Sequence, residues 1–247
     1  MEHMETIAIS KPIKMDGPHN FRDLGGYPAG KGKIRRGCFF RSDGLTGLSQ
    51  ADRDWMMQRG ITCVLDLRSK REMENTPDSL TPEFDYHAIS MSDRMNDKED
   101  GSEFPDCLSD LYIRILNTHK HEFYTVVKTL VERKGKPAVF HCAVGKDRTG
   151  VTAMLLLLLA GVPEEIILQD YAVSEKNMKE TFHMQKELLK KAGWKVPDLL
   201  FESPAGEMER TIHYLKQTWG SAENYLKECG VNDSDIEMLK LYLVETE

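Results

Sequence analysis

The string HCAVGKDRTG, residues 141–150, contains the residues of this chain that are best suited to chemistry. Cys142 follows an apolar stretch, Arg148 stands six positions later, and a second apolar stretch begins at Val151. The first stretch predicts a strand and the second predicts a helix, so the string forms a loop between the two. Backbone N–H groups and the positive end of a helix dipole meet at such a turn, which suits an oxyanion of phosphate shape.

Two side chains of this loop would act on a bound phosphate. The guanidinium of Arg148 can hold two phosphate oxygens at once. The positive end of the helix favours the thiolate of Cys142, which would be a nucleophile aimed at phosphorus. In-line attack would give a phosphocysteine, and water would then release phosphate. Gly145 lets the loop bend close to the anion, and Gly150 lets the helix pack tightly.

A buried structural cysteine is the alternative interpretation of Cys142, because cysteines are among the most buried residue types. A Cys and an Arg six positions apart also occur by chance. The whole string argues for chemistry, since His, Gly, Lys, Asp, Arg and Thr stand together between a predicted strand and a predicted helix.

Short strands alternate with helices in the first part of the chain. Ser49 can cap a helix that Gly60 ends, and residues 108–135 predict one bent helix or two. β-Branched and aromatic residues predict strands at 37–42, 61–69, 84–90 and 137–142. This alternation predicts an α/β fold with a central, mostly parallel sheet that is flanked by helices on both faces.

The remaining segments predict a loop and a helical C-terminal third. Residues 91–107 are polar and contain Gly and Pro, which favours a loop long enough to be a lid or a substrate loop. From Pro163 onward nearly every segment predicts a helix. We expect a single catalytic domain over 1–247, in which helices within 163–247 would form a lid or an extension.

The composition is that of a globular protein with an acidic surface. Charged residues make up 30% of the 247 residues, and the net charge is −7. Nucleic-acid binding is not expected, because it needs clustered Lys and Arg. The five cysteines show neither disulfide nor zinc spacing, and the N-terminus lacks the features of a signal peptide.

The sequence also argues against a membrane-spanning protein. The longest apolar run, residues 151–162, is well short of the ~20 residues that a membrane helix needs, and it predicts a buried helix. We therefore expect a cytoplasmic protein without stable membrane insertion. No segment is recognised as a basic amphipathic helix, which argues mildly against a dedicated membrane enzyme. Nothing in the sequence favours a particular oligomeric state.

The loop resembles the signature of the cysteine-dependent protein tyrosine phosphatases. Its Lys-Asp before the Arg looks like the bacterial tyrosine/serine/threonine phosphatases, also described as triple-specificity or atypical lipid phosphatases. Further stretches similar to that family are HNFRDLGGY (19–27), RRGCFFRSDGL (35–45), GITCVLDLRS (60–69), ILQDYAVSE (167–175) and AENYLKECGV (222–231). The resemblance covers nearly the full length. It implies a protein tyrosine phosphatase-like fold that hydrolyses phosphate monoesters with no metal and no other cofactor.

The resemblance also implies a role for each loop residue. Cys142 would be the nucleophile, Arg148 the phosphate clamp, and Thr149 the hydroxyl that hydrogen-bonds the thiolate. His141 would orient the loop, and Lys146 is similar to an extra cation linked to doubly charged or inositide phosphates. The positions expected to contact substrate are Ala143, Val144, Gly145 and Lys146 in the loop, and Asp66, Arg68 and Asp93 outside it.

Three carboxyl groups compete for the role of the general acid that protonates the leaving group. Asp147 lies in the loop, and in lipid-directed relatives an Asp there often has this role. Asp93 follows the third predicted strand, where many protein tyrosine phosphatases keep their acid. Asp66 ends the second predicted strand, but it is also a candidate partner for Arg68 or Arg22. We favour Asp147 and leave the other two open.

The motif NFRDLGGY has a mainly structural interpretation. Its Asn20, Arg22 and Asp23 would attach the N-terminal segment to the edge of the sheet. Arg41 and Asp43, at the end of a predicted strand, would either lock the scaffold or touch substrate.

The main prediction is a cysteine-dependent phosphatase for phosphotyrosine, with phosphoserine and phosphothreonine as further substrates. A phosphoinositide phosphatase of the same mechanism is the alternative. A pocket deep enough for a phenyl ring would favour tyrosine, whereas a wide basic floor with Lys146 exposed would favour lipid. A non-catalytic phosphate-binding module has no need of Cys142, and sulfur-transfer or arsenate-reducing enzymes commonly use a second working cysteine. The partner would be a phosphorylated protein or a phosphoinositide.

Overall fold

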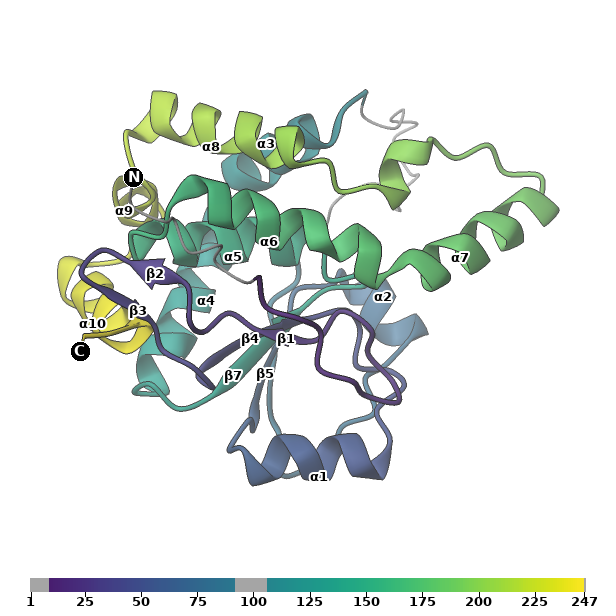
Figure 1. The fold of residues 1–247 in the computed structure, drawn as a ribbon, viewed down its shortest axis with the longest axis horizontal. Helices are drawn as coiled ribbons and strands as arrows, with labels where there is room; N and C mark the ends of the chain where they lie inside the picture. Colours follow the sequence, from purple (N-terminus) through teal and green to yellow (C-terminus); the bar gives the residue numbers. More distant parts are fainter. Residues whose placement is uncertain (1–8, 92–105, 247) are drawn as a thin grey trace, which may run out of the picture.

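A five-stranded sheet lies at the centre of the computed structural model, which describes residues 9–91 and 106–246 (Figure 1). The strand order is β1-β4-β7-β5-β6. The strands are β1 (Arg22–Asp23), β4 (Phe39–Ser42), β5 (Cys63–Asp66), β6 (Asp85–Ala88) and β7 (Ala138–His141). Strands β4, β7, β5 and β6 run parallel, and β1 pairs antiparallel with β4 at one edge. The predicted mostly parallel sheet is confirmed.

A smaller antiparallel sheet brings the two ends of the described chain together. Strand β2 (Pro28–Ala29) pairs with β3 (Gly32–Ile34), which pairs with β8 (Val244–Glu245). Strands of two or three residues are too short to show an alternation of apolar and polar residues, so the sequence carries no clear pattern for them.

The described residues also form ten α-helices and a short 3₁₀ helix, η2 (Asp198–Phe201). The predicted capping of the first helix by Ser49 is confirmed, and residues 108–135 form two helices. The helices are α1 (Gln50–Gln58), α2 (Lys70–Asn75), α3 (Leu108–Thr118), α4 (Lys120–Glu132), α5 (Asp147–Leu159), α6 (Glu164–Asn177), α7 (Lys179–Lys191), α8 (Ala205–Trp219), α9 (Ala222–Glu228) and α10 (Asp233–Leu243). The helical C-terminal third is therefore confirmed.

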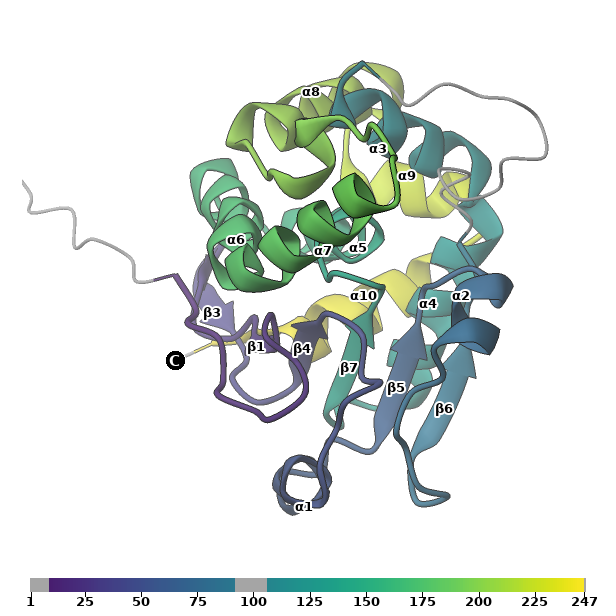
Figure 2. The same cartoon turned by 90° about the vertical axis from the view of Figure 1, so that its right-hand side faces the viewer.

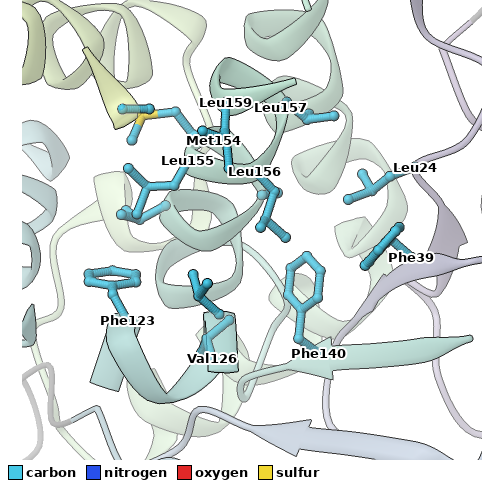
Figure 3. Packing of buried hydrophobic residues seen from close by; sticks show 14 of the residues in the cluster. Leu24, Phe39, Phe123, Val126, Phe140, Met154, Leu155, Leu156, Leu157 and Leu159 are labelled. Carbon is cyan, nitrogen blue, oxygen red and sulfur yellow. The ribbon is translucent and has the colours of Figure 1, made fainter. Parts of the chain in front are cut away.

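The strands separate two hydrophobic cores, because successive side chains point to opposite faces of a sheet. Phe39 and Phe140 pack into the larger core, and Figure 3 shows them below the leucines of α5. Phe40, Val64 and Val139 face the other way and pack with α1. Figure 2 shows α1 alone below the sheet and the bulk of the helices above it, so helices cover both faces as predicted.

Helix α5 is the buried helix that the apolar run predicts. All of its residues from 148 to 157 are buried, and it packs against β4 and β7 of the sheet and against α3, α6 and α9. A helix that is enclosed on all sides has little freedom to shift, so the loop at its N-terminus has a fixed support. Within the described chain, no helix combines the length and the apolarity that crossing a membrane requires.

Candidate active site

The predicted loop 141–150 is shorter in the structure, because β7 ends at His141 and α5 already begins at Asp147. Cys142 is the first residue after the strand, and its side chain has no exposed surface. It belongs to the larger hydrophobic core, and its neighbours Ala143, Val144 and Arg148 line a pocket.

The carbonyl groups of the loop are hydrogen-bonded to the surrounding scaffold. The backbone N–H of Gly44 donates to the Ala143 carbonyl over 3.1 Å. The side-chain amide of Asn20 donates to the Val144 and Gly145 carbonyls over 3.1 and 3.3 Å, and Arg41 Nη2 donates to the Gly145 carbonyl over 2.8 Å. In a trans peptide the N–H points opposite to the carbonyl. The N–H groups of residues 144, 145 and 146 are therefore turned away from the scaffold, which makes them donors for an oxyanion.

Gly145 is required by both backbone and space. Its φ is 67°, in the left-handed region that side chains disfavour. A Cβ at this position would lie 2.5 Å from the Ser42 carbonyl oxygen and 2.6 Å from the Asp43 nitrogen. Gly145 thus shapes the loop. It does not line the pocket, so the expected contact with substrate could come only from its backbone.

Arg148 is held by a carboxylate from another element. Its Nη1 and Nη2 atoms donate to the two carboxylate oxygens of Glu72, on α2, over 2.6 and 2.9 Å, and Nη1 also donates to the Met91 carbonyl. Burial raises the pKa of Glu72, but the hydrogen bonds and the charge of Arg148 outweigh it and lower the pKa to about 2. Glu72 is therefore ionised at neutral pH and sets the direction of the guanidinium.

Replacing Glu72 with Gln should reduce kcat/KM for para-nitrophenyl phosphate about tenfold, because hydrogen bonds between charged groups contribute about 1.5–3 kcal/mol. The neutral amide keeps the size of the side chain but cannot accept both bonds from Arg148. Steady-state kinetics of purified protein would measure the change. The control is Glu74→Gln, an exposed position on the same helix. Wild-type kcat/KM in Glu72→Gln would show that Arg148 needs no such support.

A buried cluster of charged side chains lies behind the loop. The His141 Nε2 atom lies 3.0 Å from Asp78 Oδ2, and Arg68 Nη2 lies 2.8 Å from Asp78 Oδ1 and 2.6 Å from Asp66 Oδ2. Tyr86 also donates to Asp66 Oδ2 over 2.8 Å. Burial alone lowers the pKa of His141, but the ion pair with Asp78 outweighs it and raises the pKa.

The two ring nitrogens of His141 face two acceptors. Its Nδ1 atom lies 3.2 Å from the Cys142 carbonyl, which can only accept a hydrogen bond, and its Nε2 atom faces the Asp78 carboxylate. The geometry between Nε2 and Asp78 Oδ2 is not that of a hydrogen bond, so proximity and charge hold this pair together.

The prediction that Asp66 and Arg68 contact substrate needs correction. Both are buried, neither lines the pocket, and they bind each other over 2.6 Å. Burial raises the pKa of Asp66, but the hydrogen bonds from Arg68 and the charge of His141 lower it to about 2. A carboxylate with so low a pKa has no proton to donate at neutral pH, so Asp66 is unsuited to be the general acid.

Three side chains of the same cluster could in principle hold a metal ion. Asp66, Asp78 and His141 offer ligand atoms within 4.8 Å of one another. Arg68 already bonds both carboxylates. A cation would have to displace this guanidinium and the protons of His141, so the donor set suits an ion-pair network better than a metal.

Asp147 lines the pocket and is held from behind by a tyrosine pair. Tyr112 donates to Asp147 Oδ1 over 2.6 Å, and the Tyr112 and Tyr171 hydroxyls lie 2.6 Å apart. Burial and the charge of Asp147 raise the pKa of Tyr112 well above its usual range, so this hydroxyl stays a donor. The second carboxylate oxygen of Asp147 remains for a substrate, which keeps Asp147 a candidate for the acid.

Lys146 does not occupy the position expected of a substrate-binding cation. Its side chain is fully buried, and its Nζ atom donates to the Glu202 carbonyl over 2.8 Å and lies 3.1 Å from Asp147 Oδ1. Lys146 does not line the pocket. It ties the loop to the segment that follows η2, and it acts on the pocket only through Asp147.

The roles predicted for Thr149 and Asp93 are not seen in the structure. Thr149 is buried, and its hydroxyl makes no hydrogen bond within the described chain, so the expected bond to the sulfur is not formed here. Asp93 lies outside the described residues. Its candidacy as the acid therefore stays a prediction, beside that of Asp147.

A pocket of about 660 Å³ opens above the loop. Its polar lining includes Arg71 and Glu72 from α2 and Asp147 and Arg148 from the start of α5. Its apolar lining, called the apolar wall below, comes from α7 and the segment that follows it: Phe182, Leu189, Trp194, Val196, Leu200 and Phe201. The C-terminal helices thus contribute directly to the candidate site.

The N-terminal motif attaches its segment to the sheet edge, and it also contacts the residues that hold the loop. Strand β1 pairs with β4 at the sheet edge, and Arg22 Nε binds Asp170 Oδ1 over 3.0 Å. Asp170 also binds Arg41 Nη1 over 2.5 Å, and Arg41 holds the Gly145 carbonyl. Arg41 therefore locks the scaffold and does not touch the pocket.

Several supporting residues had no predicted role in the site: Asn20, Glu72, Asp78, Tyr112 and Asp170. Glu72 stands in the pattern Ser-x-x-Glu, which forms a capping box with Ser69 at the start of α2. That pattern indicates a helix start but not a contact with Arg148, which lies 76 positions away. Asp170 lies in ILQDYAVSE, where its spacing gives no sign of two arginine partners.

Comparison with known proteins supports the family that the loop motif predicts. A family model described as the tyrosine phosphatase family matches residues 13–245. The alignment with a tyrosine-protein phosphatase of Nostoc commune is 220 positions long, is 32% identical, and covers 83% of this chain and 74% of that protein. The alignment with the triple specificity protein phosphatase PtpB of Mycobacterium tuberculosis is 271 positions long with its gaps, is 24% identical, and covers 92% of this chain and 97% of PtpB.

The solved structure of TpbA from P. aeruginosa is 12% identical and has a TM-score of 0.40 over 68% of this chain and 80% of TpbA. The family match extends over almost the whole sequence and includes the loop, its supports and the helices that wall the pocket. The family predicted from the loop is confirmed: the chain belongs to the tyrosine phosphatase family.

Proposed function

We propose that the chain is a cysteine-dependent phosphatase that hydrolyses phosphate monoesters through a phosphocysteine on Cys142. The observation that carries this proposal is the combination of three features in one loop and the helix turn after it. These are the N–H groups of residues 144–146, which are turned away from the scaffold, the Arg148 guanidinium held by Glu72, and Cys142 directly after His141. A pure phosphate-binding module would have no use for a thiol in that place.

The reaction would proceed in two displacements. The phosphate dianion binds to the loop N–H groups and to Arg148, and the Cys142 thiolate forms a bond to phosphorus while the ester oxygen leaves. Asp147 gives a proton to that oxygen. A water molecule then attacks the phosphocysteine, Asp147 takes back a proton, and inorganic phosphate leaves with the thiolate restored. Arg148 and the backbone stabilise the charge in both steps.

Asp147→Asn should slow hydrolysis of phenyl phosphate about 10²–10⁴-fold, the range of general acid catalysis. Para-nitrophenol is a better leaving group and needs little help, so its phosphate ester should be affected far less. The measurement is kcat for both esters in parallel. Asp110→Asn, at an exposed position on α3, is the control. If Asp93→Asn shows this leaving-group pattern and Asp147→Asn does not, the acid is Asp93.

The lining of the pocket supports an aryl phosphate as substrate, and phosphotyrosine is the aryl phosphate that occurs in proteins. Its wall contains three aromatic side chains, Phe182, Trp194 and Phe201, against which a phenyl ring would pack. A basic floor suited to an inositide headgroup would need Lys146 exposed, and Lys146 is buried. The name of the Mycobacterium tuberculosis relative supports phosphoserine and phosphothreonine as additional substrates.

A panel of phosphotyrosine, phosphoserine and phosphothreonine peptides and soluble inositol phosphates tests the substrate proposal. We expect phosphotyrosine peptides to have the highest kcat/KM, at least about tenfold above the inositol phosphates, because only an aryl ring fills the apolar wall. Phe201→Ala should reduce this ratio. Faster turnover of inositol phosphates than of phosphotyrosine would contradict the proposal.

We further propose that the described chain acts as one phosphatase domain. The larger core contains residues from Leu24 near the start of the described chain to Leu243 near its end. The pocket likewise takes residues from both halves, so neither half would form the site alone.

A further inference from the structure

Helix α7 and the loop after it expose an unusual amount of apolar surface. Met184, Leu188 and Trp194 are 57%, 66% and 49% exposed. In the described chain only three other large apolar side chains are exposed to a comparable degree, and they stand on separate elements: Met57, Tyr86 and Leu241. Single exposed apolar residues are normal on a protein surface, but a group within eleven positions indicates a binding surface.

The same segment is positively charged in an acidic protein. Residues 179–195 have a net charge of +3, whereas the whole chain carries −7. The lysines of this segment are Lys179, Lys186, Lys190, Lys191 and Lys195, and its only acidic residues are Glu180 and Glu187. Lys186 pairs with Asp198, so the positive charge that is complementary to an anionic surface comes from the other four lysines.

Helix α7 has apolar side chains on two different sides. Phe182 and Leu189 form the inner side and pack with Phe201 next to the phosphate loop. Met184 and Leu188, four positions apart, lie about a third of a turn away on the outer side and join none of the hydrophobic clusters of the described chain. Figure 1 shows α7 extending away from the sheet and from the other helices.

This helix corrects the expectation that the sequence contains no basic amphipathic helix. Its lysines alternate with glutamates and its apolar residues follow helical spacing, a pattern equally typical of a helix on the surface of a domain. Only the structure shows that the side with Phe182 and Leu189 packs inside the protein and that the side with Met184 and Leu188 does not.

We propose that the surface formed by α7 and residues 192–195 docks on an anionic lipid bilayer. A helix with lysines on its polar side and Leu, Met and Trp on the other lies in the plane of the interface, with its apolar face in the boundary of headgroups and acyl chains. The lysines would be attracted to anionic headgroups, and Trp194 would lie at the level where aromatic rings are enriched.

Docking would place the candidate active site beside the membrane. Gln185, Leu189 and Trp194 line the pocket and belong to the same segment as the exposed residues. The pocket entrance would therefore open next to the bilayer. This inference goes beyond the proposed hydrolysis and does not depend on which monoester is cleaved.

Co-sedimentation of the full chain with vesicles tests the proposal. Vesicles of phosphatidylcholine with phosphatidylserine should bind the protein, and vesicles of phosphatidylcholine alone should bind it much less. Met184→Gln with Leu188→Gln should lower the partition coefficient at least about tenfold, and so should Lys190→Gln with Lys191→Gln. Leu241→Gln, 61% exposed on α10, is the matched control and should bind like the wild type.

Hydrolysis of para-nitrophenyl phosphate in solution should be unchanged in these variants, because none of the substituted residues lines the pocket. No binding to anionic vesicles, or equal binding by the Met184/Leu188 variant, would overturn the proposal. A concentration-dependent dimer that forms without lipid and is lost in that variant would also overturn it, by assigning the surface to a second copy. Binding without turnover would contradict only the proposed hydrolysis.

Discussion

Cys142→Ser is expected to lower kcat for para-nitrophenyl phosphate by at least about 1,000-fold, because a serine hydroxyl is far less ionised than a thiol and is a much weaker nucleophile. The substitution keeps the size of the side chain, so the fold should be unchanged. The measurement is phosphate release by the purified variant, with circular dichroism as the check on folding.

The matched control is Cys107→Ser, a half-buried cysteine before α3 that does not line the main pocket. It should retain full activity. Comparable loss in both variants would indicate a general effect of thiol removal. Undiminished turnover in Cys142→Ser would leave the buried structural cysteine as the correct interpretation.

Asp170→Asn should lower the free energy of unfolding by about 3–5 kcal/mol, because it leaves two buried guanidinium groups without a counter-charge. Arg22, Arg41 and Asp170 are each almost completely buried, and Tyr27 also donates to Asp170. Chemical denaturation followed by circular dichroism measures the difference. A change below about 1 kcal/mol would mean that the arginines find other partners or water.

The effect of Asp170 should depend on pH in a defined direction. Burial raises the pKa of Asp170, but the charges of Arg22 and Arg41 outweigh it and lower the pKa to about 2. The stabilisation is therefore fully present above the unfolded pKa of about 3.9 and is lost as the pH falls toward 2. The gap between wild type and Asp170→Asn should narrow below about pH 4. Glu228→Gln, at an exposed ion pair with Lys120, should change stability little at any pH.

The local patterns of the sequence predict most of the central fold. The strands that end at Ser42, Asp66 and His141 are short buried runs bounded by turn residues, and Ser49 and Gly60 mark the ends of α1. These features depend on neighbours in the chain, which a sequence displays directly. The sheet of β2, β3 and β8 pairs residues 32–34 with residues 244–245, and no local pattern specifies a pairing between segments so far apart in the chain.

The sequence predicts those site residues that stand together in one motif. It does not predict the contacts that these residues make with partners far away in the chain. The position of Cys142 after a strand and of Arg148 in the first turn of a helix follows from adjacent apolar runs. The direction of the Lys146 side chain depends on the Glu202 carbonyl, 56 positions away, so the spacing of the motif could not place it. The substrate roles expected for Asp66 and Arg68 failed for a related reason, since their mutual ion pair satisfies both side chains inside the fold.

The central claim is a covalent phosphocysteine on Cys142, and rapid acid quenching with mass spectrometry tests it most directly. Wild-type protein mixed with para-nitrophenyl phosphate and quenched within a turnover should carry one phosphoryl group, and peptide mapping should locate it on Cys142. The adduct should be absent in Cys142→Ser. Turnover without any adduct, or an adduct on another residue, would contradict the account.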